Sequence, residues 1–307
     1  MLINYIKLYK EKYNYYKYYT PINTFISSDK HRSVHEILRT VGNEGEVNAA
    51  HSGNAGDIIY SLPVLKRLHE ITAKPLNILM RINEPLALAA GFEHPLGNVM
   101  LDEAMAQRLQ PLLEAQPYIN KAKLIENEKI HLDLTLFRKA GLELDKGNIA
   151  RWNFYTTGIN TDLSKPWLFV NPDQQFAGTI VLARSSRYNN PFIDYSFLSA
   201  YQDIVFVGVK SEYLSMKKNI PCLRWQQVDD FLEMAQIIAG SKLFIGNQSF
   251  PFSVAEGLKV PRILEVYHRT PNVIPEGSNG YDFYFQKHFE YLVDSLYYKA
   301  PDLLPTG

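Results

Sequence analysis

Apolar and polar positions alternate along the chain in a way that predicts short buried strands followed by amphipathic helices. Residues 47–50 (VNAA) form a strand-like run, a turn of small residues follows, and apolar residues then recur with helical spacing from Ile58 to Leu68. Further apolar runs at residues 76–80, 122–125 and 130–137 predict strands, and residues 85–92 and 101–115 predict helices. Strands that alternate with helices are typical of a parallel, doubly wound α/β sheet.

The second half of the chain repeats this pattern. Short apolar runs occur at residues 167–170 and 179–183, strands are expected at 204–209, 243–245 and 262–266, and helical spacing covers 228–239, 252–258 and 283–299. Residues 148–165 lack clear periodicity and end in Lys165-Pro166, so we place a domain boundary there. The expected parts are an extension and connector (1–45), an N-terminal domain (46–164), a C-terminal domain (165–282) and a helical tail that packs back on the N-terminal domain (283–307).

Residues 1–20 have an unusual composition, with seven of the chain's 20 tyrosines and four lysines. Their spacing predicts a basic helix with an aromatic face, ended by Pro21 and followed by a connector with a short helix at residues 33–40. Such a helix can make peripheral contact with an anionic membrane surface. We favour the alternative that the tyrosines pack on the main body or on a partner subunit, because tyrosine is a poor deep membrane anchor.

Composition narrows the class of protein. Hydrophobic residues make up 46% and charged residues 21% of the 307-residue chain, so a folded protein is expected. The 32 basic and 32 acidic residues cancel, which argues against a dedicated nucleic-acid binder. The single cysteine, Cys222, permits neither an internal disulfide nor a cysteine zinc cluster. Lys7 and Lys10 interrupt any signal-peptide core, so we expect a cytoplasmic protein, either free or at the inner face of the membrane.

Candidate chemistry lies at two strand–turn–helix junctions, residues 52–58 and 246–253. Ligands of open α/β sheets bind at the carboxyl ends of strands, so two such domains facing each other would form a cleft with one junction on each wall. At the first junction, Asp57 is either the chemical centre of an enzyme or only a helix N-cap. At the second, the backbone N–H groups before the helix suit a phosphate, unless Ser249 or Ser253 simply caps that helix.

A basic loop, Arg184-Ser185-Ser186-Arg187, follows the run at residues 179–183. Its two guanidiniums and two hydroxyls suit a diphosphate, since arginine binds phosphate oxygens in fork geometry; a solvated surface loop is the alternative. His51 either orients a substrate or, as we favour slightly, finishes a strand. Other kinds of site are excluded by their motifs. No Lys-Ser/Thr follows Gly53 and Gly56, as a phosphate-binding loop requires, and no third glycine completes a dinucleotide-binding motif. The histidines lack the spacing of metal ligands, and the GxSxG motif of a serine nucleophile is absent.

The two junctions together resemble the motifs of the heptosyltransferase-like glycosyltransferases, family 9, which have the GT-B fold. Residues 53–68 (GNAGDIIYSLPVLKRL) resemble the family's glycine turn, Gly-Asp, apolar stretch, Leu/Thr-Pro and apolar-basic helix. Residues 244–261 begin FIGNQSFP and end AEGLKVP, and resemble a strand, Gly-Asn-Asp-Ser-Gly-Pro and a helix ending in Ala-Leu-Gly-Val-Pro. Residues 204–212 (IVFVGVKSE) are similar to a strand–Gly–Glu segment, so the resemblance covers about residues 46–280.

This resemblance implies two Rossmann-like, doubly wound parallel-sheet domains that face each other across a cleft, with the acceptor on the N-terminal domain and a nucleotide-sugar on the C-terminal one. It implies an inverting, metal-independent transfer of a sugar to an acceptor hydroxyl, in which Asp57 takes the proton and no cofactor takes part. The implied acceptor-side residues are His51, Gly53, Asn54 and Gly56, and the implied donor- and phosphate-binding residues are Arg184, Arg187, Gly246, Asn247, Gln248, Ser249, Phe250, Ser253 and Glu256.

The chain departs from the family at its second motif. Gln248 stands where the family has Asp, Phe250 where it has Gly, and Ser253 where it has His, so the donor wall is bulkier and less charged. Glu265 either resembles a donor-contacting carboxylate of other GT-B enzymes or is a charge at a strand edge. The alternatives to a glycosyltransferase are a non-catalytic nucleotide- or sugar-binding scaffold and a nucleotide-sugar epimerase or hydrolase. The sequence does not identify the sugar, the nucleotide base, the acceptor (a glycan or a lipid-linked saccharide) or the oligomeric state.

Overall fold

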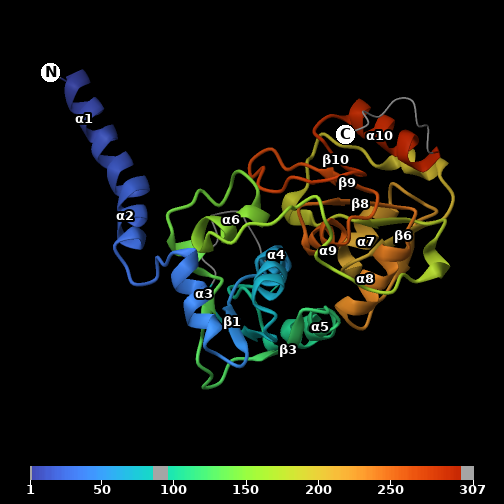
Figure 1. The fold of residues 1–307 in the computed structure, drawn as a ribbon. Helices are drawn as coiled ribbons and strands as arrows, with labels where there is room; N and C mark the ends of the chain where they lie inside the picture. The colour runs from blue at the N-terminus through green and yellow to red at the C-terminus, as the bar shows by residue number, and fades with distance from the viewer. Residues whose placement is uncertain (1, 86–95, 299–307) are drawn as a thin grey trace.

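The computed structural model describes residues 2–85 and 96–298 of the chain. It has two lobes, each with one sheet and flanking helices, and a helical arm that extends from the N-terminal lobe (Figure 1). The helix expected at residues 85–92 lies almost wholly outside the described residues. No helix in the described part of the chain is long and apolar enough to cross a membrane.

The first sheet has four parallel strands in the order β3-β2-β1-β4. They are β1 (Val47–His51), β2 (Leu76–Met80), β3 (Ile119–Leu124) and β4 (Leu132–Asp133). The helices of this lobe are α3 (Val34–Gly42), α4 (Ala55–Thr72), α5 (Glu103–Glu114) and α6 (Ile149–Thr157), with a 3-10 turn at Leu136–Lys139. Because β4 lies on the other side of β1 from β2, the strand order reverses at β1, which is where such sheets bind ligands.

The second sheet has six parallel strands in the order β10-β9-β8-β5-β6-β7, and its order reverses between β5 and β8. The strands are β5 (Ile180–Ala183), β6 (Ile204–Val207), β7 (Arg224–Gln226), β8 (Leu243–Asn247), β9 (Arg262–Glu265) and β10 (Gly280–Phe283). The helices are α7 (Lys210–Lys217), α8 (Phe231–Gly240), α9 (Phe250–Leu258) and α10 (Gln286–Tyr298), with 3-10 turns at Gln174–Phe176, Ser186–Tyr188 and Ser196–Ala200.

One hydrophobic core runs through both lobes, and a second covers the other face of the second sheet. The shared core includes Ile58 and Leu62 of α4 and continues through Phe252 of α9. In the second core, Phe289 of α10 stacks on Phe283 of β10 with ring centroids 4.1 Å apart. The tail helix therefore packs on the C-terminal lobe. The prediction that the tail packs on the N-terminal domain is wrong. The chain enters α10 from β10, an edge strand of the second sheet that the sequence pattern did not reveal, and α10 packs on the face of that sheet.

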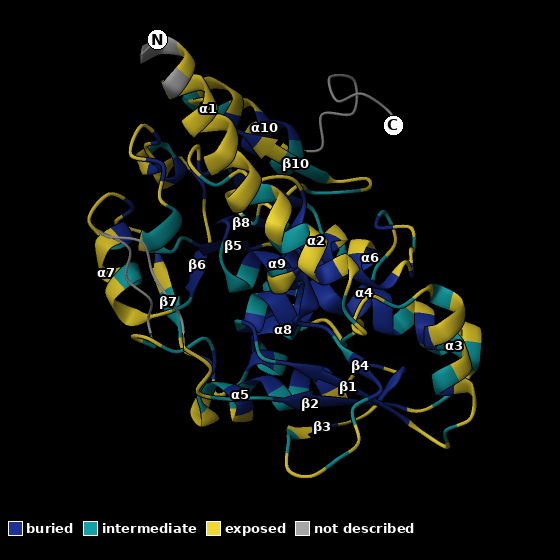
Figure 2. Ribbon diagram, turned by 90° about the vertical axis from the view of Figure 1, so that its left-hand side faces the viewer, coloured by how far each residue is buried: buried dark blue, intermediate teal, exposed yellow. Residues whose placement is uncertain are grey.

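The N-terminal segment protrudes from the body as a helical arm (Figure 1), and its surface is exposed along most of its length (Figure 2). This arm consists of α1 (Leu2–Asn14), a π-helical turn (Tyr15–Tyr19) and α2 (Thr20–Ile26). Pro21 does not end the helix, contrary to the prediction, because proline fits the first turn of α2. Tyr9, Tyr13 and Tyr16 are exposed, so the expectation that these tyrosines pack on the main body is wrong.

Three further segments differ from the sequence pattern. Residues 148–165 contain α6, which Asn148 caps by accepting a hydrogen bond from the Ala150 N–H. The strand expected at residues 130–137 is short, because Asp133 accepts the Thr135 N–H at 3.0 Å and the chain turns there. The run at residues 167–170 forms no strand, since its first two N–H groups bond to the Gly257 carbonyl.

Candidate functional site

A cavity of about 840 Å³ lies between the two lobes. Its lining includes Asn54, Gly56, Asp57, Tyr60, Arg108 and Arg138 of the N-terminal lobe, and Arg184, Ser185, Arg187, Lys210, Glu212, Gln248, Ser249 and Phe250 of the C-terminal lobe. Both predicted junctions therefore reach the same cavity. They do so because β1, β5 and β8 end where the order of their sheets reverses.

The first turns of α4 and α9 pack against each other across the two lobes. A Cβ placed on Gly56 would lie 3.8 Å from Ser253 Oγ and 3.9 Å from the Phe250 Cα. The Phe250 ring packs in turn on Phe231 of α8, with centroids 4.3 Å apart. The two junctions thus adjoin, and both border the cavity.

Asp57 is the third residue of α4 and is 8% exposed. Its Oδ2 accepts a hydrogen bond from the Asn54 N–H at 3.1 Å and forms an ion pair with the Arg138 guanidinium. Asn54 is the N-cap residue, so Asp57 occupies the capping-box position rather than the cap itself. None of the bonds among the described residues uses Oδ1. One carboxylate oxygen is therefore anchored while the other can meet a ligand in the cavity.

Arg138 is a site residue that the sequence reasoning missed. It lies on the 3-10 turn after β4, and β4 pairs with β1, so the turn ends beside the Asp57 turn. The guanidinium rests over the Phe137 ring at 5.1 Å, which fixes its position. A basic residue shortly after a strand was the available signal, but the apolar run at residues 130–137 concealed where that strand ends.

His51 shapes the turn instead of contacting the cavity. The side chain is fully buried, and Nδ1 accepts the Gly53 N–H at 2.9 Å. Burial lowers the pKa of His51 to about 4, so the imidazole is neutral near pH 7 with its proton on Nε2. A Cβ on Gly53 would lie 2.7 Å from His51 Cε1 and 2.8 Å from Asp57 Oδ2, so only glycine fits there. His51 is the last residue of β1, which confirms the prediction that it finishes a strand.

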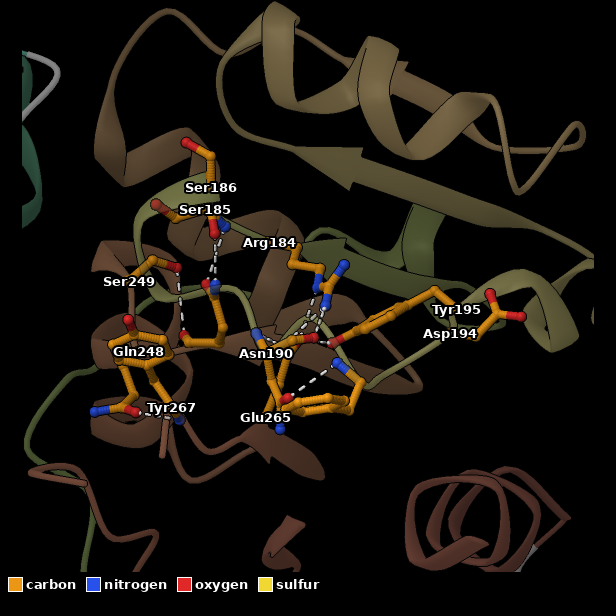
Figure 3. Close-up of polar contacts among 12 residues, drawn as sticks. Arg184, Ser185, Ser186, Asn190, Asp194, Tyr195, Gln248, Ser249, Glu265 and Tyr267 are labelled. Carbon is orange, nitrogen blue, oxygen red and sulfur yellow. Dashed lines mark hydrogen bonds and ion pairs between the residues drawn. The ribbon is translucent and has the colours of Figure 1, made fainter. Parts of the chain in front are cut away.

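Arg184 is not a free cation, contrary to the expectation that it binds phosphate. Its Nε donates to Glu265 Oε2 at 2.7 Å and its Nη2 to Oε1 at 2.9 Å, in the two-pronged arrangement seen in Figure 3. The fully buried Glu265 also accepts from the Tyr195 hydroxyl at 2.7 Å and from the Asn190 N–H. Glu265 is therefore neither a donor-contacting carboxylate nor an edge charge. It holds the loop after β5 to the end of β9.

Asn247 and Gln248 also serve the scaffold. Asn247 is fully buried, and its amide both accepts the Ser185 N–H at 2.9 Å and donates to the Ser185 carbonyl at 2.7 Å. The Gln248 amide donates to the Thr270 carbonyl and accepts the Tyr267 N–H, both at 2.6 Å. Both amides are thus already paired, although Gln248 borders the cavity. Their predicted role as phosphate ligands is not supported.

The start of α9 offers fewer backbone donors than a phosphate cradle needs. Pro251 has no N–H, and the N–H groups of Phe252 and Ser253 bond to the Ser249 carbonyl. The Ser253 hydroxyl is buried and donates to the Phe250 carbonyl at 2.6 Å. Among the first residues of the helix, Phe250 alone can offer a backbone donor. The expectation of an anion site built by several N–H groups is therefore wrong.

Two other predicted donor-side residues are structural. Gly246 is packed so closely that a Cβ there would lie 2.9 Å from the Ala183 carbonyl oxygen. Glu256 is 2% exposed and is paired with Lys259 and with the fully buried Arg262, and it does not line the cavity. Burial also lowers the pKa of Lys259 to about 8, against the raising effect of Glu256. This ionic cluster fixes α9 to β9.

Arg187 is the cation of the predicted loop that remains unpaired at the cavity. Among the described residues no carboxylate lies within 4 Å of its guanidinium, which rests over the Tyr188 ring at 4.7 Å. Lys210 and Glu212, at the start of α7, line the cavity beside it and were not predicted. Burial raises the pKa of the Glu212 carboxyl above its usual value, although hydrogen bonds from the preceding loop oppose the rise.

Buried polar atoms without partners collect around the cavity. In residues 2–85 and 96–298, eight buried side-chain nitrogen or oxygen atoms lack a hydrogen-bond partner, and four belong to residues that line the cavity. These four are Asn54 Oδ1, Tyr60 Oη, Arg138 Nε and Arg187 Nε. An unpaired buried group costs about 1–3 kcal/mol, so this concentration indicates a site for a polar ligand. No group of three histidine, cysteine or carboxylate side chains in the described part of the chain is placed to hold a metal ion.

Neither a protein-family model nor a curated protein matches the chain. Solved structures do match its fold. A glycosyl transferase of family 9 from Veillonella parvula superimposes with a TM-score of 0.56 at 11% identity, over 83% of this chain and 98% of that one. The E. coli heptosyltransferase WaaC, solved with ADP, gives 0.55 at 8% identity over 82% and 99%.

The ADP-heptose heptosyltransferase II of E. coli gives a TM-score of 0.51 at 12% identity, over 83% of this chain and 99% of that one. The chain therefore has the GT-B fold of the family 9 glycosyltransferases.

Proposed function

We propose that the chain is a glycosyltransferase that moves a sugar from a nucleotide-sugar to an acceptor hydroxyl. The observation that carries the proposal is Asp57, which has one anchored oxygen and one open oxygen in a cavity that the two lobes share. The unpaired Arg187 lines the same cavity from the other lobe. A carboxylate and a cation in one cavity suit a reaction that removes a proton at one end and releases an anion at the other.

The proposed reaction is a single displacement. Asp57 Oδ1 takes the proton of the acceptor hydroxyl while its oxygen attacks the anomeric carbon of the sugar. The bond from that carbon to the diphosphate oxygen breaks, and the electron pair leaves with the nucleoside diphosphate. Attack from the face opposite the leaving group inverts the anomeric configuration. Arg138 and the Asn54 N–H keep Asp57 in position throughout.

Arg187, with Lys210 beside the same cavity, is the proposed binding group for the departing diphosphate. A guanidinium binds two phosphate oxygens at once, and Lys210 adds a point charge. In this proposal these cations neutralise the developing charge in place of a metal ion. Arg184 takes no part, because Glu265 already compensates it.

The proposed donor is a nucleoside diphosphate sugar, and the proposed acceptor is a glycan or a lipid-linked saccharide, as in polysaccharide biosynthesis. The ADP in the similar WaaC structure supports a nucleotide ligand. The locked Gln248 amide and the Phe250 ring make this donor wall unlike that of the family motif, so the sugar is not assigned to a heptose. We propose a cytoplasmic setting for the enzyme.

A non-catalytic nucleotide- or sugar-binding scaffold is the second candidate. It is favoured by one observation: Asp57 is already paired with Arg138, as a purely structural carboxylate would be. An epimerase or hydrolase of nucleotide-sugars would use the same cavity.

One experiment separates the three functions. Nucleotide-sugars are first screened by thermal shift, because a ligand that binds the folded state raises its melting temperature. Release of nucleoside diphosphate and conversion of the nucleotide-sugar to its epimer are then measured with and without saccharide acceptors. Release that requires an acceptor supports the transferase, and rapid turnover without one supports the epimerase or hydrolase. Binding with no turnover across the panel would replace the proposal with the scaffold.

A further inference from the structure

Exposed aromatic and aliphatic side chains are more concentrated on the arm than on the rest of the described chain. Eight of the 19 exposed large apolar side chains among the described residues lie in residues 6–26. They are Ile6, Leu8, Tyr9, Tyr13, Tyr15, Tyr16, Tyr19 and Ile26. In Figure 2 the arm is coloured as exposed over most of its length. An apolar surface of this kind in an otherwise well-packed protein marks an interaction site.

Charge on the arm is arranged around one aromatic face. At 100° per residue, Ile6, Tyr9 and Tyr13 share one side of α1, and the exposed Tyr16 follows in the π-helical turn. Lys10 flanks this face on one side and Lys12 on the other, while Glu11, the arm's one carboxylate, points the opposite way. The arm carries four lysines, so its net charge is +3 in a chain whose net charge is zero.

The root of the arm is fixed to the N-terminal lobe beside the Asp57 turn. Phe25 is buried against Leu136 and Ala140, which flank Arg138 in the 3-10 turn after β4. A Cβ on Gly141 would lie 2.5 Å from Ile22 Cγ1, so this segment and α2 are in close contact. The arm thus extends from the segment that carries the ion-pair partner of Asp57.

We propose that the arm is an interfacial anchor that lays its tyrosine face on an anionic membrane surface, on the side of the molecule that carries Asp57. Tyrosine is enriched at the headgroup level of bilayers, where its ring is half buried and its hydroxyl meets water. Lysines on both flanks of such a face extend to the lipid phosphates. This inference does not depend on the proposed catalytic activity.

A second copy of the chain fits the arm less well. Two arms that packed through their tyrosine faces would bring Lys10 and Lys12 of one copy against the same residues of the other. Glu11 lies on the far side of each helix and cannot neutralise them. Like charges at the flanks of a helix pair oppose association, whereas an anionic surface attracts every lysine of the arm.

The test is flotation of the full-length protein with phosphatidylcholine vesicles that contain or lack phosphatidylglycerol. The anchor variant replaces the four arm lysines with glutamine: Lys7, Lys10, Lys12 and Lys17. The matched control replaces four exposed lysines of the body with glutamine: Lys121, Lys165, Lys218 and Lys287. Both variants lose the same charge. The wild type and the control should float with anionic vesicles, and the anchor variant should bind them on the order of 100-fold more weakly.

A second variant, in which Tyr9, Tyr13 and Tyr16 become serine, keeps the charge and should also lose most of its binding. The proposal is overturned if the wild type fails to float, or if the anchor and control variants float equally. An arm-dependent dimer that forms in solution without vesicle binding would assign the surface to a second copy instead. Far-ultraviolet circular dichroism of each variant checks that the body remains folded.

Discussion

At Gly53 the backbone packs closely against two polar side chains. The imidazole of His51 accepts the Gly53 N–H, and both this ring and the Asp57 carboxylate would contact a Cβ at Gly53. The turn therefore sets where the open carboxylate oxygen points. Gly56, three residues on, has no such restriction, since a methyl group there would make only ordinary contacts of 3.8 Å and 3.9 Å.

Gly53→Ala should displace Asp57 and reduce turnover on the order of 100-fold, because a misplacement of about 1 Å is enough for such a loss. Its free energy of unfolding should fall by roughly 1–3 kcal/mol. Gly178→Ala is the control, because it lies outside the cavity lining and nothing lies within 4 Å of a Cβ there; it should keep its activity with a stability within about 1 kcal/mol of the wild type. Steady-state kinetics and urea denaturation check both, and equal effects of the two substitutions would contradict the close packing described for Gly53.

The buried, neutral His51 makes stability depend on pH. The folded state resists protonation down to a pKa of about 4, while the unfolded chain binds the proton below about pH 6.5, so stability is lost as the pH falls through this window. The loss from this residue is on the order of 3 kcal/mol. His51→Asn keeps an acceptor for the Gly53 N–H but does not titrate.

Urea denaturation between pH 7 and pH 4 should therefore show a shallower loss of stability in His51→Asn than in the wild type. The exposed His35→Asn serves as the control and should follow the wild type. Parallel curves for all three proteins would show that His51 does not carry the effect.

At the scale of elements, the two arginines of the loop after β5 have different roles: Arg184 holds the loop in place, and Arg187 faces the cavity. Arg184 is tied to the fully buried Glu265, whereas no carboxylate of the described residues lies within 4 Å of the Arg187 guanidinium. Removing one member of a buried pair costs about 3–5 kcal/mol because the other charge is left uncompensated.

Arg184→Met should consequently lose about 3–5 kcal/mol of stability. Arg187→Met should keep its stability within about 1 kcal/mol and weaken nucleoside diphosphate binding about 10- to 100-fold, as expected for hydrogen bonds to a charged group. Chemical denaturation and calorimetric titration measure the two effects. Loss of stability in Arg187→Met together with loss of nucleoside diphosphate binding in Arg184→Met would contradict these two roles.

The sequence pattern could predict the elements that carry their own periodicity, but not the pairing of their side chains. The alternation of strands and helices predicted the α/β architecture, and the resemblance of the two junctions to family 9 motifs implied the GT-B fold. Both are confirmed. The pattern could not show that Gln248 is saturated by the 267–272 loop, because that contact joins distant parts of the chain. Arg138 was missed for the same reason, since only the pairing of β4 with β1 brings it to Asp57.

At the scale of the whole molecule, the two lobes share one hydrophobic core and are joined by hydrogen bonds. Their shared core joins α4 to α9, and Arg108 of α5 donates to the carbonyls of Val228 and Asp229 in the other lobe, at 2.9 Å and 3.2 Å. The pattern of apolar and polar residues could not predict this contact or the protrusion of the arm. Both depend on which surfaces lie against each other in the folded protein. A face of tyrosines looks the same in sequence whether it is covered or exposed.

Differential scanning calorimetry of the full chain should therefore show one unfolding transition, because the lobes share a core and cannot lose it separately. The calorimetric and van't Hoff enthalpies should agree. Two resolved transitions would mean that the interface between the lobes is too weak to couple them.

Asp57 is the residue on which the proposed chemistry depends. The most direct measurement compares Asp57→Asn with the wild type, for turnover of the nucleotide-sugar and acceptor pair found in the screen and for the Kd of the nucleoside diphosphate. The predicted result is a fall in kcat of about 100- to 10,000-fold with an unchanged Kd, because the variant keeps the cavity but loses the base. Turnover within a few-fold of the wild type would show that Asp57 serves only the capping box of α4 and removes no proton.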